Sequence, residues 1–173
     1  GVAYFGEGIF PHETVYLCAV DAATGKEIWK NDAISQQDAG RNDLSPQGYL
    51  LCNEKLLYVP SGRSLPVAFD KKTGEMAHGR KHAWRTTAGG VVGGTAAVLG
   101  DGQIYSSGPN HFLAMDQNSG SIGHAWIKGR QMTFAGEKAY IATGEAMIKV
   151  DRAAHAKASI ERQKLFLKLR QVP

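Results

Sequence analysis

The chain has 173 residues, of which 43% are hydrophobic and 21% are charged, so it is long enough to form a domain with a sizeable core. Its net charge of +4 belongs to the C-terminal segment, because residues 151–173 hold six basic and two acidic side chains while residues 1–150 hold 14 of each. The first 150 residues therefore give no charge-based case for nucleic-acid binding. No run of 18 apolar residues occurs, which argues against a membrane-spanning helix.

A phrase beginning at Ala19 is the most informative part of the chain, because it recurs. It reads Ala-Val-Asp-Ala-Ala-Thr-Gly-Lys-Glu-Ile-Trp over residues 19–29, and shorter copies occupy residues 68–75 and 114–121. A fainter copy ends at Asp151, so the marking aspartates stand at positions 21, 70, 116 and 151. Short β-like runs that recur at this spacing between Gly-containing turns are typical of β-propeller blades.

The middle of the chain shows one complete unit, over residues 49–74. Apolar runs at 49–52, 56–60 and 65–69 are separated by short polar segments, and a fourth short run follows the Asp turn. Residues 95–120 repeat the same order. Aromatic and β-branched runs of this length, bounded by Gly, Asn, Asp and Ser, predict strands. We therefore expect an all-β fold of about three to four blades, each with four antiparallel strands.

The Asp-x-x-Thr-Gly turn of this repeat has a structural explanation. Its Asp carboxylate can accept hydrogen bonds from nearby amides, its Thr or Ser hydroxyl can do the same, and its Gly supplies a positive φ. A Trp on the outer strand would pack against the neighbouring blade, since a lone sheet cannot bury its faces. The alternative is a set of calcium ligands, but one Asp per blade is too dispersed for a site. The residues that we assign to the structural repeat are Asp21, Thr24, Gly25, Trp29, Asp70, Thr73, Gly74, Asp116, Ser119, Gly120 and Trp126.

With this phrase, residues 1–150 resemble the PQQ-like, or quinoprotein alcohol dehydrogenase-like, β-propellers. The resemblance implies a bacterial protein that is exported, periplasmic or secreted, and a ring of seven or eight blades. Three to four blades would make this chain a part of a longer protein or one subunit of a ring closed by association. The family contains both quinoprotein dehydrogenases, which use PQQ and calcium, and propellers that bind no cofactor.

The residues give no support for a quinoprotein active site in this chain. Such a site would need an acidic calcium cluster, a Trp platform and, in the dehydrogenases, an adjacent Cys pair, whereas Cys18 and Cys52 are far apart in sequence. We therefore expect no catalytic residue, no metal site and no cofactor, with PQQ and calcium as the alternative. Both cysteines lie in apolar runs, where we expect buried free thiols, although sequence alone does not exclude a disulfide.

Candidate ligand-binding residues lie in loops, where the fold does not demand them. Arg63 follows the second run of its unit, and Trp84 and Arg85 lie in the loop that leads to the next unit. A guanidinium there could grip a carboxylate or an acidic partner loop, and an inter-blade salt bridge is the competing explanation. His78 and His82 lie in a basic stretch with Gly79, where we expect a solvated loop rather than a metal site.

The C-terminal segment, residues 151–173, is a different kind of structure. Asp151 is a suitable N-cap, and Ala, Leu, Lys and Arg follow without Gly or Pro until Pro173. This composition predicts a basic amphipathic helix or a linker. It would lead to further chain, bind a second copy or another partner, or lie on an anionic surface.

The incomplete ring leads to an expectation about partners. We expect both end blades to expose apolar surface meant for neighbours, and a protein partner or self-association at these open edges and the C-terminal helix. The helix could cover one face with Ile160, Leu165 and Leu169.

Two functions remain open from the sequence. The first is a non-enzymatic PQQ-like β-propeller segment that acts as a scaffold or interaction module within a larger exported bacterial protein. The second is a fragment of a quinoprotein-type oxidoreductase whose cofactor site lies outside this chain. The absent cofactor constellation favours the first, so enzymatic activity is not expected.

Overall fold

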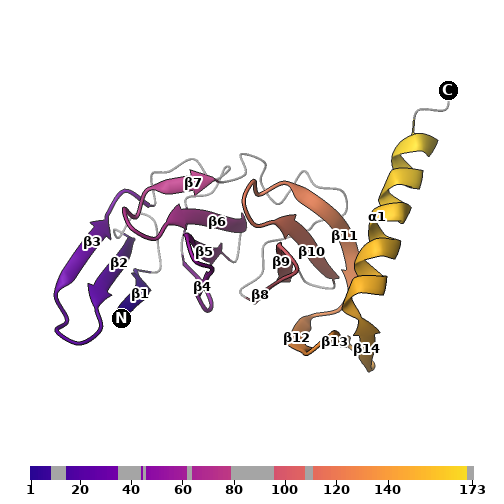
Figure 1. The fold of residues 1–173 in the computed structure, drawn as a ribbon, viewed down its shortest axis with the longest axis horizontal. Helices are drawn as coiled ribbons and strands as arrows, with labels where there is room; N and C mark the ends of the chain where they lie inside the picture. Colours follow the sequence, from indigo (N-terminus) through magenta and orange to yellow (C-terminus); the bar gives the residue numbers. More distant parts are fainter. Residues whose placement is uncertain are drawn as a thin grey trace.

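The computed structural model of the protein consists of four antiparallel sheets followed by one helix (Figure 1). At positions 64, 123–127 and 163 it describes the backbone alone. The described residues are 1–8, 15–34, 44, 46–61, 64–78, 96–107 and 111–170.

Within each sheet, strands that follow one another in the chain lie next to one another. We call the sheets blades 1 to 4. Blade 1 contains β1 (Val2–Glu7), β2 (Tyr16–Asp21) and β3 (Glu27–Asn31). Blade 2 contains β4 (Leu51–Cys52), β5 (Leu56–Ser61), β6 (Ser64–Asp70) and β7 (Met76–His78). Blade 3 contains β8 (Ala97–Gly100), β9 (Gln103–Ser107), β10 (His111–Asp116) and β11 (Ile122–Lys128). Blade 4 contains β12 (Gln131–Ala135), β13 (Lys138–Ala142) and β14 (Met147–Asp151), and α1 (Arg152–Leu169) follows.

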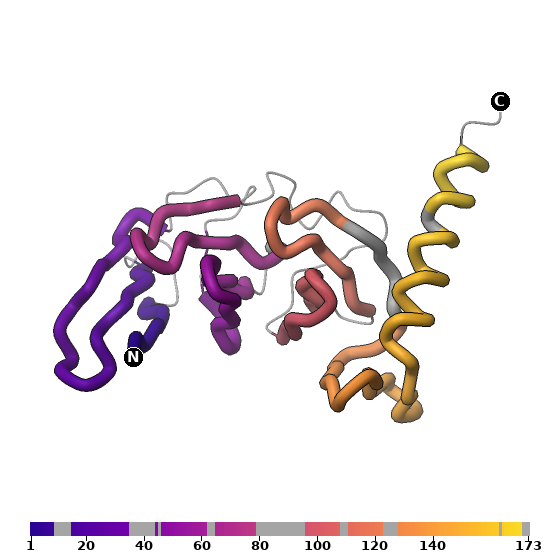
Figure 2. Tube along the Cα trace, viewed as in Figure 1, coloured from indigo at the N-terminus to yellow at the C-terminus, as the bar shows by residue number. Residues whose placement is uncertain are grey.

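The blades lie side by side in chain order, as Figures 1 and 2 show. The N-terminus belongs to blade 1, and α1 stands at the opposite end of the row, in contact with β11 and β14. Blades 2 and 3 have the four strands that the repeat predicts, which confirms an all-β fold of propeller blades with a C-terminal helix. Blades 1 and 4 each have one face without a neighbouring blade among the described residues.

The hydrophobic core is divided into three layers, one between each pair of blades. Side chains alternate along a strand, so each blade sends one set of side chains to the blade before it and the other set to the blade after it. The first layer joins Leu17 and Ala19 to Val67 and Phe69. The second joins blades 2 and 3, and the third joins blades 3 and 4.

The three Asp turns of the repeat share one geometry. In each turn the Asp Oδ1 accepts hydrogen bonds from the amides two and three residues later, at 2.7–3.1 Å. The Asp carbonyl accepts a hydrogen bond from the Gly four residues later, at 2.8–3.0 Å. That Gly has a φ between 66° and 73°, a conformation that other residues adopt only with strain. The chain therefore makes one helix-like turn and returns as the next strand.

Asp151 occupies the same register position in blade 4, but it begins a helix. Its Oδ1 accepts a hydrogen bond from the Ala154 amide at 2.9 Å, again three residues later. His155 stands where the other turns have Gly. Because no residue there favours a positive φ, the first turn continues as α1, and Asp151 serves as its N-cap.

The helix packs against the blades only in its first half. Arg152, His155 and Ser159 are half-buried, whereas the described side chains from Ile160 onward are exposed. Leu165, Phe166 and Leu167 are all more than half exposed, and three consecutive residues cannot share one helix face. The helix is therefore basic but not amphipathic in this half. The three residues that were expected to cover a blade face, Ile160, Leu165 and Leu169, remain exposed.

Candidate interaction surfaces on the blades

One cross-strand row of side chains recurs in the blades. In blade 2 the register aligns Tyr58 of β5 with Ala68 of β6 and His78 of β7. Tyr58 and Ala68 belong to the core layer shared with blade 3, so the row faces the next blade in the chain. We call it the docking row. Its counterparts by backbone register are Tyr4, Ala19 and Trp29 in blade 1 and Tyr105, Ala114 and His124 in blade 3, where the side chain of His124 is not described.

Trp29 ends the docking row of blade 1 and binds the Asp turn of blade 2. Its indole Nε1–H donates a hydrogen bond to the Lys71 carbonyl at 2.9 Å. The ring covers Gly74 so closely that a Cβ built on this glycine would lie 2.5 Å from the Trp29 ring. The side chain is only 8% exposed. Trp29 therefore packs against blade 2, and Gly74 is needed for close approach as well as for its positive φ.

His78 makes the same contact between blades 2 and 3. Its Nε2 lies 2.8 Å from the Gln117 carbonyl, and because a carbonyl can only accept, this nitrogen carries the proton. A Cβ built on Gly120 would lie 2.6 Å from His78 Nδ1. The prediction of a solvated loop is therefore wrong for His78, which is the last residue of β7. His82 lies outside the described residues.

A polar network surrounds this second contact. The Tyr58 hydroxyl donates to the Gln117 carbonyl at 3.2 Å and accepts a hydrogen bond from Asn53 Nδ2 at 2.8 Å. The Gln117 side chain donates to the Gln103 carbonyl at 3.1 Å. Burial raises the pKa of Tyr58 to about 12, so the hydroxyl keeps its proton and remains a donor at neutral pH.

The sequence contains a signal for His78 that the repeated phrase obscured. Trp29 and His78 each lie eight residues after the turn Asp, at 21 and 70, and the same count from Asp116 reaches His124. The register confirms His124 as the residue paired with Ala114. Trp126 lies two residues further along β11 and is not the row residue; its side chain is not described.

Charged residues close the interface between blades 3 and 4. The Arg152 guanidinium binds the Asp101 carboxylate through two hydrogen bonds, of 2.7 and 3.0 Å. The same guanidinium donates to the Gly136 carbonyl at 2.8 Å and lies 4.1 Å from the Phe134 ring centre. Phe134 meets Tyr105 of the docking row edge to face, with ring centres 5.4 Å apart. The start of α1 thus fixes blade 4 against blade 3.

The free face of blade 1 is apolar. Ala3, Phe5, Cys18 and Val20 occupy the positions that Leu57, Val59, Val67 and Phe69 occupy in blade 2. In blade 2 all four side chains are buried against blade 1. On blade 1, Phe5 is 42% exposed and Ile28 is 50% exposed. The first blade therefore presents the kind of surface that the blades use to bind one another.

The free face of blade 4 has a different chemistry. Tyr140 and Lys149 are the counterparts of the Tyr and Ala of the docking row, so Lys replaces the Ala that the other three blades carry. Thr133, which pairs with Tyr140, is the counterpart of Val98 in blade 3. Gln131, Thr133 and Lys149 are exposed, and Met147 is the large apolar side chain among them. The expectation that both end faces are apolar is therefore wrong for blade 4.

The two cysteines behave differently. Both are free thiols, and Cys18 is buried as predicted, with burial raising its thiol pKa. Cys52 is exposed, because β4 is a two-residue edge strand.

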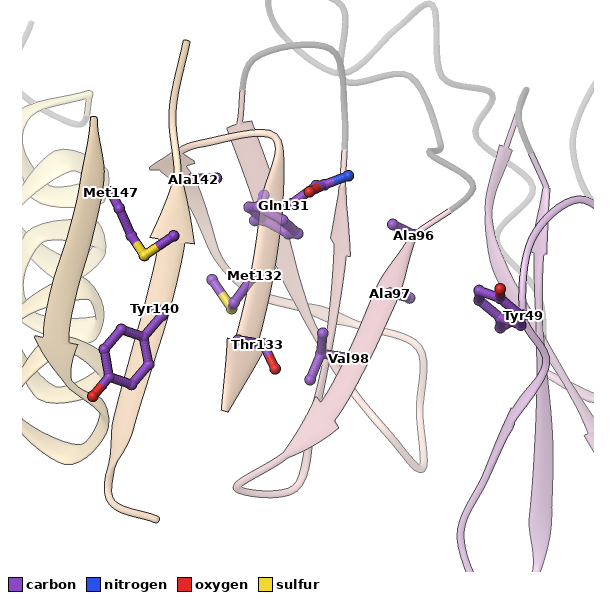
Figure 3. A pocket seen from close by; sticks show the side chains of 11 residues that line it. Tyr49, Ala96, Ala97, Val98, Gln131, Met132, Thr133, Tyr140, Ala142 and Met147 are labelled. Atoms are coloured by element: carbon purple, nitrogen blue, oxygen red, sulfur yellow. The ribbon is translucent and has the colours of Figure 1, made fainter. Parts of the chain in front are cut away.

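A cavity of about 310 Å³ is lined by residues of blades 3 and 4 and by Tyr49, which precedes blade 2 (Figure 3). Ala97 and Val98 line it from β8, Met132 from β12, and Tyr140 and Met147 from the last two strands. None of the described side chains that line it is charged. Elsewhere in the described residues, no three His, Cys, Asp or Glu side chains come together as metal ligands. These residues therefore do not supply the acidic cluster that a calcium–quinone site needs.

The ligand-binding candidates Arg63, Trp84 and Arg85 lie outside the described residues and stay predictions. No helix in the described part of the chain is long and apolar enough to cross a membrane.

Comparisons with known proteins agree with this architecture. The profile of a family described as outer membrane protein assembly factor BamB matches residues 12–159. A search of curated protein sequences gave no match.

Solved structures also show the fold. BamB from Moraxella catarrhalis superposes with a TM-score of 0.61 at 18% identity, over 88% of this chain and 44% of that one. Quinohemoprotein alcohol dehydrogenase ADHIIG from Pseudomonas putida HK5 gives 0.59 at 16% identity, over 88% and 31%. The computationally designed protein Ika4 gives 0.53 at 10% identity, over 79% of each chain. This chain thus spans less than half of the two natural proteins. By its repeated Asp turns, its blades and the profile that covers most of its length, the chain belongs to the PQQ-like β-propeller family described as outer membrane protein assembly factor BamB.

Proposed function

We propose that this chain is a non-enzymatic propeller segment that serves as a scaffold or interaction module within a larger exported bacterial protein, in the periplasm or secreted. The observation that carries the proposal is the free face of blade 1. Its side chains occupy positions that are buried between blades elsewhere in the chain. Exposed apolar surface of this kind is typical of sites of protein association.

The similarity to an outer membrane protein assembly factor supports both association and export. The exposed second half of α1 supports a second contact region, because Leu165, Phe166 and Leu169 are each more than half exposed beside Lys164 and Lys168. A protein partner or a second copy would bury these side chains.

The competing function is part of a quinoprotein-type oxidoreductase, and the similarity in fold to a quinohemoprotein alcohol dehydrogenase supports it. The described residues provide no acidic cluster for calcium, so the scaffold is the function that they fit better. Addition of PQQ and calcium to the purified chain separates the two. A saturable quinone absorbance would favour the oxidoreductase.

Sedimentation velocity over a range of concentrations tests the role of the blade 1 face. The variant Phe5→Ser/Ile28→Thr removes apolar side chains from this face. The control variant Met147→Ser removes an apolar side chain that is even more exposed, at 74%, from the face of blade 4. We expect the wild-type chain to associate, the first variant to associate at least tenfold more weakly and the second to behave as wild type. Equal behaviour of all three chains would contradict the proposal.

A further inference from the structure

The exposed second half of α1 carries an apolar stripe between positive charges. Successive residues of an α-helix are turned by about 100°, so Leu165, Leu169 and Phe166 lie within one arc of about 100° on the helix surface. All three side chains are more than half exposed. Lys168 and Arg170 flank this arc on its two sides, and the Arg170 guanidinium lies 5.6 Å from the Phe166 ring centre. We call these five residues the helix stripe.

The free face of blade 1 has the complementary arrangement, an apolar centre with two carboxylates near it. Burial raises the pKa of the Cys18 thiol at this centre, and the nearby Lys30 ammonium lowers it. The Glu27 and Glu7 carboxylates raise it further, so both lie close to the centre of the face, and both side chains are exposed. The Lys30 ammonium lies over the Tyr16 ring, 3.7 Å from its centre. Each carboxylate is therefore available to a cation from outside.

The spacing of charges on the two surfaces also agrees. Glu7 and Glu27 pair with residues of β2 that are four positions apart, which is about 13 Å along the strand. On α1, Arg162 lies on the same side as the helix stripe and precedes Arg170 by eight residues, which is about 12 Å along the axis. A helix that lies along the strands can therefore place one cation beside each carboxylate.

We propose that the helix stripe of one copy binds the free face of blade 1 of a second copy. Leu165, Phe166 and Leu169 would cover Phe5 and Ile28, and the flanking basic side chains would lie beside the two carboxylates. Because α1 and blade 1 stand at opposite ends of the row (Figure 1), the contact is heterologous and joins copies head to tail. This inference rests on the proposed scaffold function, and it names a second copy as the partner of the blade 1 face.

Other pairings of the same surfaces are less complementary. Two helix stripes would bring basic side chains together, and two blade 1 faces would bring the carboxylates together, so like charges oppose both pairings. The free face of blade 4 is the competing partner for blade 1. Its exposed Thr133 and Lys149 would lose water opposite an apolar centre that offers them no hydrogen bonds, which is costly.

The test uses two variants of the full chain, each of which loses one of the two surfaces. The face variant is Phe5→Ser/Ile28→Thr, and the helix variant is Leu165→Ser/Phe166→Ser. Sedimentation velocity should show association of the wild-type chain with a dissociation constant on the order of 10–100 μM, because half a helix makes a small interface. Each variant alone should associate more weakly by about tenfold or more.

An equimolar mixture of the two variants is the decisive sample. The helix variant keeps an intact blade 1 face, and the face variant keeps an intact helix stripe. One wild-type contact can therefore form between them, and the mixture should give a one-to-one dimer with nearly the wild-type affinity. The dimer should not grow, because both of its outer surfaces are altered. Only a heterologous contact between these two surfaces predicts such rescue.

A matched control separates the helix stripe from the rest of the helix. Ile160→Ser/Leu167→Ser makes the same kind of change at two exposed residues that lie on the opposite side of α1. This variant should associate as the wild-type chain does. Because it also introduces two Ser residues into the exposed half of the helix, it accounts for a loss of helix content.

Wild-type association by the helix variant, equal weakening in the control, or a mixture without a dimer would each overturn the inference. If the face variant alone is weakened, the blade 1 face remains an interaction surface and the proposed function stands, with a different partner. Weakening by Met147→Ser in place of the helix variant would assign that partner to the face of blade 4. Monomeric behaviour of every chain would overturn the inference and contradict the proposed function as well.

Discussion

Blades 1 and 4 are built from the same repeat, yet their free faces differ. The face of blade 1 carries Phe5 and Val20 in positions that bury apolar side chains elsewhere, and the face of blade 4 carries the polar side chains of Thr133 and Lys149. Repeat arrays need a polar outer face where stacking stops. The comparison indicates that the face of blade 1 is better suited than the face of blade 4 to bind a further blade.

Replacement of the Trp that ends the docking row of blade 1 should give the largest loss of stability. Trp29→Ala removes a buried indole and leaves the Lys71 carbonyl without its donor, so we expect the free energy of unfolding to fall by about 3–5 kcal/mol. Urea denaturation monitored by circular dichroism measures it. An unchanged unfolding midpoint would mean that the contact between blades 1 and 2 does not stabilise the fold.

The second prediction compares the glycine of the Asp turn in blade 2, which the Trp29 ring covers, with the glycine of the Asp turn in blade 1, which is open. Gly25→Ala and Gly74→Ala introduce the same Cβ at nearly the same positive φ, and each should cost about 1–2 kcal/mol of backbone strain. At Gly74 the Cβ would also strike the Trp29 ring, which should add about 1–3 kcal/mol. Equal destabilisation of the two variants, measured by the same denaturation, would refute the difference in occupancy.

The ion pair between blades 3 and 4 should contribute less. Asp101→Asn and Arg152→Gln each break the paired hydrogen bonds. The Asp101 side chain is 42% exposed, and exposed ion pairs contribute little because water screens them. We expect a coupling free energy of about 1 kcal/mol from the double-mutant cycle. A value of zero would show that blade 4 is held by apolar packing alone.

Acid titration tests whether the Asp turn of blade 1, whose glycine is open, has the same geometry as the Asp turn of blade 3, whose glycine His78 covers. Hydrogen bonds from the Thr24 side chain and backbone lower the pKa of Asp21, and those from Ser119 lower the pKa of Asp116. A lowered pKa stabilises the fold above the ordinary value of about 3.9 and loses that contribution as the pH falls through the lowered value. Both carboxyls should therefore titrate below about 3.9 by NMR. An ordinary pKa for Asp21 alone would show that the turn on blade 1 is not preformed.

The smallest effect on folding is expected at the face of blade 4. Thr133→Val/Lys149→Ala gives blade 4 the residues that blade 3 has at these positions, Val98 and Ala114. Exposed substitutions of this kind should change stability by less than about 0.5 kcal/mol. Association should nevertheless increase, because the polar face would be lost. Sedimentation velocity of this variant beside Lys157→Ala, an exposed residue of α1, distinguishes the face from a change in net charge. No gain in association would mean that polarity does not limit stacking here.

Local patterns could be predicted from the sequence, and contacts between blades only in part. The Asp turns follow from hydrogen bonds within five residues, so the repeated phrase was enough to place them. Trp29 followed from the same phrase, but His78 did not, because a histidine among basic residues and Gly79 looks like a solvated loop until the register aligns it with Trp29. The place of Lys149 on the free face of blade 4 could not be predicted, because it follows from the cross-strand pairing with Tyr140. No local pattern shows that pairing.

The four turn aspartates have a consequence for how such chains change direction during evolution. Hairpin closure and helix initiation begin here with the same Asp and the same hydrogen bond from the amide three residues later. They diverge at the next two positions, where the hairpin turns have Thr or Ser followed by Gly and the helix has Ala154 followed by His155. Glycine turns the chain back into its own blade, and His155 sends it outward along a helix. Changes at these two positions can therefore decide whether whatever follows stays within the array or is carried away from it.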